Sequence, residues 1–388
     1  MLWTNWFRRG VGRDRDPPRP AERVSARVSS GYRLHIARFL NKWFNVPRVW
    51  RARPDMRSCL NHGACLGKSS RRDCSKTEMN AESDNENWSS VLESADNGGV
   101  SGNERETPTV ADFNISVAST QGKRTSMEDQ HAADQLKCGE YTIPYFAVYD
   151  GHGGVEAAEY AKRKMPGIIA GTLQMHLQKR CSENTAQAMS KSDIWNALKL
   201  SFVKLNDAFN QEHPDLVTVG TTALFSLIID GKLWTASAGD SRAVLLRSDE
   251  TVALTSDAKP SVEKFKTSVE KRGGYITFGR VAHYNEMGVL IGGLAVARAI
   301  GDASAKGISA RPKITCVDWR PTDTLILACD GPFEVGSRMQ VAKCVRTHGK
   351  QNWQTAADAV IKNASCSKDN MTVMVIGQNQ DASSLTQS

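Results

Sequence analysis

The chain has 388 residues, of which 40% are hydrophobic and 24% are charged, and its formal net charge is +8. It is long enough to bury a sizeable core, and it has no apolar run of roughly 18 residues that would predict a membrane-spanning helix. The basic excess lies in residues 1–60, where 13 Arg and one Lys face four acidic residues, so the overall charge is no argument for nucleic-acid binding. We expect no specific nucleic-acid partner.

Residues 1–60 are rich in Arg and Pro, which predicts a largely disordered basic arm. Within it, residues 32–44 place apolar side chains on one helical face, typical of an amphipathic helix that contacts a membrane surface or a partner weakly. An unstructured or loosely packed segment is an equally good interpretation. Residues 61–109 have the composition of a polar linker, and residues 381–388 form a C-terminal tail.

The nine cysteines are odd in number and include no Cys-x-x-Cys pair, which favours reduced thiols in an intracellular protein. We therefore expect a location in the cytoplasm or nucleus. Mitochondria are the second choice, because the arm is Arg-rich and partly amphipathic but also carries acidic residues.

From Phe113 onward the pattern predicts a folded domain over residues 110–380. Asp230-Gly231 between two apolar runs is a hairpin signal, and hairpin-connected strands with a few helices favour an α+β fold with antiparallel sheets. Strands are expected at 113–118, 144–149, 222–229, 232–238, 242–247, 289–297, 313–318, 324–329 and 371–376, and helices at 155–165, 193–211, 261–272, 337–348 and 352–364.

Aspartates follow the ends of several apolar runs, at Asp150, Asp240 and Asp330, and Asp369 precedes another run. Strand ends meet at one rim of a sheet, so these carboxylates are expected to converge. Converging carboxylates repel one another unless a cation balances them, and a hard divalent ion suits oxygen ligands. Each Asp-Gly alone is more often a turn, so the argument depends on the set.

Two cationic side chains complement this acidic set. Arg124 could bind two phosphate oxygens with its planar guanidinium. His152, two residues after Asp150, could donate a proton to a leaving oxygen. Taken singly, the first would be an ordinary surface arginine and the second a turn histidine.

Seven segments, in order and spacing, resemble the signature segments of the protein phosphatase 2C family. They are residues 124–129 (RTSMED), 150–154 (DGHGG), 220–223 (GTTA), 238–242 (AGDSR), 294–302 (LAVARAIGD), 330–331 (DG) and 368–373 (KDNMTV).

The resemblance implies a β-sandwich of two antiparallel sheets flanked by helices, a four-layer α-β-β-α arrangement. It also implies a monomer with two Mg²⁺ or Mn²⁺ ions that activate water for in-line attack on phosphoserine or phosphothreonine in phosphorylated protein substrates. The metal ligands it implies are Asp150, the Gly151 carbonyl, Asp330, Asp369 and Glu128; Arg124 would bind phosphate and His152 would be the general acid. Outer positions, or ligands of a third metal, would be Asp129, Asp240, Asp302, Glu334 and Asn370.

Three departures from the family pattern stand out. Ala258 replaces a frequent histidine, and Glu334 stands where aspartate is common, which puts a third metal in question. Residues 281–292 are longer than in many members, which suggests a hypothesis of altered substrate choice or a partner contact there. The alternative function is a catalytically impaired pseudophosphatase that acts as a protein-binding module. The presence of Asp150, Asp330 and Asp369 favours activity instead.

Overall fold

The computed structural model describes residues 110, 112–182, 189–248, 250–349 and 352–379, with the side chains of 179–182 excepted. The basic arm, its amphipathic segment, the polar linker and the C-terminal tail lie outside these residues, so those predictions stay untested. No helix in the described part of the chain is long and apolar enough to cross a membrane.

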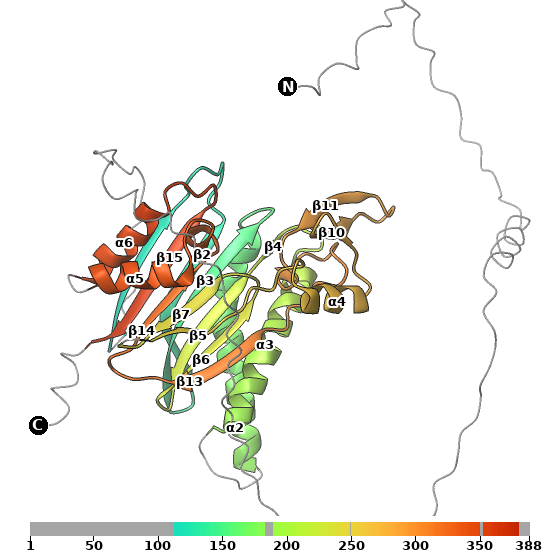
Figure 1. Cartoon of the computed structure of the whole chain (residues 1–388). Helices are drawn as coiled ribbons and strands as arrows, with labels where there is room; N and C mark the ends of the chain where they lie inside the picture. Colours follow the sequence, from blue (N-terminus) through green and yellow to red (C-terminus); the bar gives the residue numbers. More distant parts are fainter. Residues whose placement is uncertain (1–109, 111, 183–188, 249, 350–351, 380–388) are drawn as a thin grey trace, which may run out of the picture. The chain divides into compact units, whose positions relative to one another are not determined.

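Two antiparallel sheets form the centre of the described domain (Figure 1). The first has the order β1-β15-β14-β7-β8, and the second has the order β12-β4-β3-β5-β6-β13 with β2 paired to β3. Their strands are β1 (Phe113–Thr120), β2 (Asp129–Cys138), β3 (Tyr141–His152), β4 (Gly220–Thr221), β5 (Ala223–Ile229), β6 (Lys232–Ala238), β7 (Arg242–Leu246), β8 (Thr251–Ala253), β12 (Ile300–Gly301), β13 (Lys313–Asp318), β14 (Thr324–Ala328) and β15 (Met371–Gln378).

Helices cover the outer face of each sheet (Figure 1). The pair α2 (Glu156–Ser182) and α3 (Lys191–Glu212) shares one buried cluster with β3, β5 and β6. The pair α5 (Arg338–His348) and α6 (Trp353–Asn363) shares another with β7, β14 and β15. A third cluster, including Phe146, Leu224 and Leu325, joins the inner faces of the two sheets. These three cores give the four-layer α+β architecture that the resemblance implied.

A small sheet stands beside the sandwich, with the order β11-β10-β9. It consists of β9 (Ile276–Thr277), β10 (Arg280–Tyr284) and β11 (Leu290–Leu294), and α4 (Glu263–Lys271) shares its buried cluster. We call residues 275–294 the flap. It contains the long 281–292 stretch that departs from the family pattern.

Local sequence explains most element boundaries. The β5–β6 hairpin turns at Asp230 and Gly231, whose φ angles of 51° and 67° fit the tight turn expected from this dipeptide. Helix α3 begins earlier than expected because Ser190 caps its N-terminus. The Asp193 amide donates a hydrogen bond to the Ser190 hydroxyl, and the Asp193 carboxylate accepts one from the Ser190 amide, which together form a capping box.

Helix α2 and strand β2 depart most from expectation. We expected the first helix to end at residue 165, but α2 continues through Pro166 because Ile169 and Leu173 keep the same face fully buried. That burial offsets the hydrogen bond that proline cannot donate. Strand β2 was missed because its sequence is polar, and its pairing with β3 is what holds it in the sheet.

Candidate metal centre and active site

The first two carboxylates of the site face each other across a strand pair. Asp129 opens β2 and lies directly opposite Asp150 near the end of β3. Asp129 is buried, and its Oδ2 accepts a 2.8 Å hydrogen bond from the Thr372 hydroxyl on β15. The other oxygen, Oδ1, is buried without a hydrogen-bond donor among the described residues.

Three strand-end aspartates converge, as the sequence predicted. One carboxylate oxygen from each of Asp150, Asp240 and Asp330 lies within 4.8 Å of the others. Asp240 follows β6 and Asp330 follows β14, so both sheets contribute to the cluster. A second set within the same limit joins Asp129 and Asp150 to the Cys329 thiol.

Burial and mutual repulsion raise the pKa values of Asp129, Asp150 and Asp330. The pKa of Asp330 rises to about 8, through burial first and then the charge of Asp240. The pKa of Asp129 rises to about 6, chiefly through burial, and that of Asp150 rises well above its ordinary value for the same reason and because four other aspartates surround it. Oxygen donors whose ionisation is this costly fit a divalent cation.

Lys259 lies at the edge of the same cluster. Its Nζ is 3.1 Å from Asp240 Oδ2 and 3.9 Å from Asp330 Oδ2. The ammonium therefore offsets part of the negative charge. Sequence reasoning noted the surrounding Asp257–Pro260 segment but gave Lys259 no role, and its only signal was a lone cation in that motif.

The backbone around Asp150 is held from two sides. The Asp150 amide donates to the Thr222 hydroxyl at 3.2 Å, and Thr222 and Ser241 share a 2.7 Å hydroxyl–hydroxyl bond. On the other side, the Gly151 amide donates to the Glu128 carbonyl at 3.2 Å. A Cβ at position 151 would collide with that carbonyl oxygen, so the position requires glycine.

Asp369 pairs with Arg124 and does not join the tight triad. Arg124 Nη2 donates to Asp369 Oδ2 at 2.8 Å, with 56% of the arginine side chain exposed. Asp369 is still close enough for its charge to raise the pKa of Asp330. The predicted phosphate-binding and metal-ligand residues thus neutralise each other here.

Asn370 links the two loops that carry these residues. Its side-chain amide donates to the carbonyls of Gln121 and Ser126, at 2.9 Å each, and its Oδ1 accepts from the Glu128 amide at 2.9 Å. The buried Asn370 side chain therefore holds the 121–128 loop against the start of β15. This contact is structural and uses every polar atom of the amide group.

The remaining two glutamates bond to nearby serines. Glu128 Oε1 accepts from the Ser126 hydroxyl at 2.8 Å. Glu334 Oε2 accepts from the Ser367 hydroxyl at 2.7 Å and from the Lys368 amide at 3.3 Å, which fixes the loop that carries Asp369.

His152 belongs to a separate buried chain that leads into the flap. Its Nε2 lies within 3.0 Å of both oxygens of Asp302, whose carboxylate is fully buried and also lies 3.7 Å from His283 Nε2. His283 Nδ1 is 2.7 Å from the Ser304 hydroxyl, which in turn donates to the Val217 carbonyl. Sequence analysis did not identify His283, because nothing in its local pattern marks a partner for Asp302.

Comparisons with known proteins identify the family. The family model described as protein phosphatase 2C matches residues 113–371. Protein phosphatase 2C homolog 2 of Aspergillus flavus is 32% identical, over 67% of this chain and 62% of that relative. Protein phosphatase 2C homolog 3 of Schizosaccharomyces pombe is 33% identical, over 68% of this chain and 64% of that protein. Protein phosphatase 1K, mitochondrial, of Xenopus laevis is 32% identical, over 66% of this chain and 65% of that protein.

Solved structures share the fold. Serine-threonine phosphatase 2C from Toxoplasma gondii superposes with a TM-score of 0.58 at 20% identity, covering 71% of this chain and 98% of that one. A C. elegans sex determining protein superposes with a TM-score of 0.54 at 23% identity, covering 72% of this chain and 68% of that one. This chain spans less than two-thirds of the length of the three relatives above. On the family match and the shared fold, the chain belongs to the protein phosphatase 2C family.

Proposed function

We propose that this protein is a metal-dependent phosphatase that hydrolyses phosphoserine and phosphothreonine in proteins. The observation that carries the proposal is the triad of Asp150, Asp240 and Asp330, three strand-end carboxylates within 4.8 Å and with no tight counter-ion except Lys259 among the described residues. Asp150 and Asp330 have raised pKa values, so ionising both carboxyls is costly unless a nearby cation balances their charge.

The donor set suits two Mg²⁺ or Mn²⁺ ions, held by Asp150, the Gly151 carbonyl, Asp330, Asp369 and Glu128. Asp129, Asp240, Asp302, Glu334 and Asn370 take outer positions in this proposal. When bound, such ions make water a nucleophile at neutral pH and neutralise phosphate charge. We place Asp240 closest to the ions among the outer residues, because its carboxylate is part of the triad.

Arg124 holds the substrate phosphate in this proposal. Its side chain is more than half exposed and its only carboxylate partner among the described residues is Asp369. A cation held by Asp369 would leave the Arg124 guanidinium free to bind two phosphate oxygens.

His152 protonates the serine or threonine oxygen as the phosphorus–oxygen bond breaks. Asp302 orients the imidazole from behind and favours its charged form: burial lowers the pKa of His152, but the Asp302 carboxylate outweighs it and the net shift is upward. The raised pKa favours the protonated imidazolium, the form of His152 that can donate a proton. The alkoxide leaves as an alcohol.

The test is turnover of a phosphothreonine peptide by the purified full chain with Mn²⁺, with Mg²⁺ and with EDTA. We expect metal-dependent hydrolysis that Asp330→Asn lowers by at least 100-fold. The matched control is Asp358→Asn, on the exposed face of α6. A folded protein with no turnover at any metal concentration would instead favour the pseudophosphatase alternative, a protein-binding module.

The compartment is also a proposal. We favour the cytoplasm or nucleus, with mitochondria second; one similar protein, from Xenopus laevis, carries the word mitochondrial in its name. Microscopy of the full chain with a C-terminal fluorescent tag would decide between them.

A further inference from the structure

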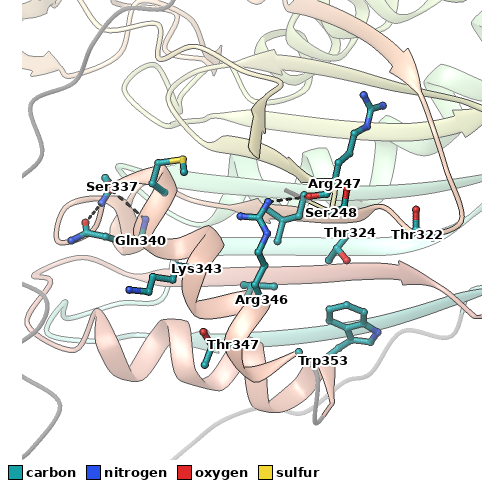
Figure 2. A pocket seen from close by; sticks show the side chains of 14 residues that line it. Arg247, Ser248, Thr322, Thr324, Ser337, Gln340, Lys343, Arg346, Thr347 and Trp353 are labelled. Atoms are coloured by element: carbon teal, nitrogen blue, oxygen red, sulfur yellow. Dashed lines mark hydrogen bonds between the residues drawn. The ribbon is translucent and has the colours of Figure 1, made fainter. Parts of the chain in front are cut away.

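Figure 2 shows a basic pocket that lies apart from the metal centre, whose residues it does not include. It has a volume of about 1000 Å³ and is lined by the end of β7, the start of β14 and one side of α5. Thr324, in its wall, opens β14, whereas Asp330 follows the other end of that strand. Asp330 lies six positions after Thr324 along this extended chain, a distance of roughly 20 Å, so the pocket is separate from the site described above.

The pocket carries positive charge that is not neutralised. Arg346 donates to three neutral acceptors, the carbonyls of Arg247 and Glu250 and the Thr251 hydroxyl, and Lys343 is exposed beside it. Figure 2 shows the Arg346 side chain reaching from α5 toward Arg247. Among the described residues, no carboxylate pairs with Lys343 or Arg346, and none lines the pocket.

The same pocket has an apolar wall. Trp353 opens α6, and its ring packs closely over the backbone of Gly349 and Gly377. Leu246 and Met339 also line the space, and 59% of Met339 is exposed. Cations beside an aromatic and aliphatic wall suit an acidic peptide with an apolar anchor.

This chain contains such a segment just ahead of the described domain. Residues 80–104 include six acidic residues and no Lys, Arg or His. Trp88, Val91 and Leu92 interrupt this acidic stretch at i, i+3 and i+4, a spacing that would put them on one side of a helical turn. An apolar cluster in an otherwise polar stretch has the composition of a docking segment.

The segment can reach the pocket. The described domain begins at Val110, which is bridged to Phe113 at the start of β1. Phe113 pairs with Gln378 on β15. At the same end of the sheet, Thr324 of the pocket wall pairs with Gly377 on β15 and with Leu246 on β7. Three strand spacings, roughly 15 Å, separate β1 from β7. The chain between Trp88 and Val110 can extend over roughly 70 Å, so the link imposes no strain.

We propose that the acidic segment 80–104 docks in this basic pocket within the same chain, with Trp88 as the apolar anchor and Lys343 and Arg346 facing its carboxylates. Because the pocket lies away from Asp330, docking leaves the metal centre open. The contact tethers the arm to the domain and does not inhibit it. A tethered segment acts at an effective concentration in the millimolar range, so weak contacts suffice.

The test is carbodiimide cross-linking of the full chain at low micromolar concentration, read by mass spectrometry. This reagent joins amines to carboxylates in direct contact. We expect Lys343 to cross-link to Glu82, Glu86 or Glu93, and the yield to fall at least fivefold in Trp88→Ala. The matched control is Lys362, also exposed but at the end of α6.

Hydrogen exchange gives a second, independent measurement. Amides of 80–104 should exchange more slowly in the parent chain than in the Lys343→Glu, Arg346→Glu double variant. Three outcomes would overturn the proposal: Lys343 cross-linking no more than Lys362, exchange unchanged by the double variant, or cross-links that join two chains and grow with concentration. Metal-dependent turnover should be unchanged in Trp88→Ala, so the result stands apart from that of the proposed function.

Discussion

His152 and Asp302 make a forked contact, in which the imidazole Nε2 lies 3.0 Å from Oδ1 and 2.9 Å from Oδ2 of the carboxylate. Asp302 has a φ of 55°, in the left-handed region that non-glycine residues rarely occupy, and its side chain is fully buried. The backbone is therefore held in an unfavourable conformation at the residue that orients the proposed acid.

Asp302→Asn should slow hydrolysis most for substrates whose leaving oxygen must be protonated. We expect kcat on a phosphothreonine peptide to fall by about 100-fold, the usual contribution of a general acid, and kcat on p-nitrophenyl phosphate to fall much less. The basic limb of the pH–rate profile should also move to lower pH, because His152 loses the carboxylate that favours its charged form. Equal losses on both substrates with an unmoved profile would contradict the role.

Asp330→Asn should stabilise the metal-free protein at high pH. The pKa of Asp330 is about 8 in the folded chain against an ordinary value of 3.8, so the folded state binds more protons between these values. Stability of the parent should therefore fall as pH rises from about 5 to 8, and the variant should lose less. Urea unfolding in EDTA at several pH values measures this. With saturating Mg²⁺ the parent should become more stable than the variant, because only the parent keeps the full set of proposed metal ligands.

Lys259→Met should tighten metal binding. The lysine ammonium lies 3.1 Å from Asp240 and competes with an incoming cation for the same carboxylates. A unit charge about 4 Å away is worth ~1 kcal/mol in water-like surroundings, which corresponds to about fivefold in the Mn²⁺ dissociation constant. Calorimetric titration checks this, with Lys266→Met on the exposed side of α4 as the control. Weaker binding in Lys259→Met would show that the lysine supports the site instead of competing.

Phe278→Gly should separate stability from substrate binding in the flap. Phe278 is 98% exposed and has a φ of 51°, so the side chain contributes no packing and strains the turn. Glycine should raise the free energy of unfolding by about 1 kcal/mol, measured in urea. If the flap contacts protein substrates, KM on a phosphoprotein should rise while p-nitrophenyl phosphate kinetics stay unchanged. If KM were unchanged on every phosphoprotein tried, the Phe278 ring would not contact protein substrates.

The flap exposes apolar side chains in residues 281–292, the stretch for which the sequence suggested altered substrate choice or a partner contact. Met287 is 84% exposed, and Val289, Leu290 and Ile291 are each about half exposed. Apolar side chains gathered on one small sheet are typical of contact surfaces. The exposure of these residues could not be read from the sequence, which predicted a strand over residues 289–297 without deciding which of its side chains are buried.

The sequence by itself determined an α+β fold with antiparallel sheets, and it predicted that aspartates at strand ends converge. The sandwich of two sheets was expected only from the resemblance to the protein phosphatase 2C family. Alternating apolar runs, the Asp230-Gly231 turn and aspartates at strand ends are local features, so they can be read without knowing the pairing of distant strands. The polar strand β2 escaped this reasoning because only its ladder with β3 defines it.

Tertiary structure alone decided which acidic residues meet and what opposes them. Asp240 joins Asp150 and Asp330 because the packing of the two sheets brings the end of β6, in one sheet, near the end of β14, in the other, while Asp369 pairs with Arg124. The contacts of Lys259 with Asp240 and of His283 with Asp302 each join residues 19 positions apart, and no local pattern encodes them. Periodicity specifies the elements, but side-chain partners across sheets depend on register and packing, which exist only once the chain has folded.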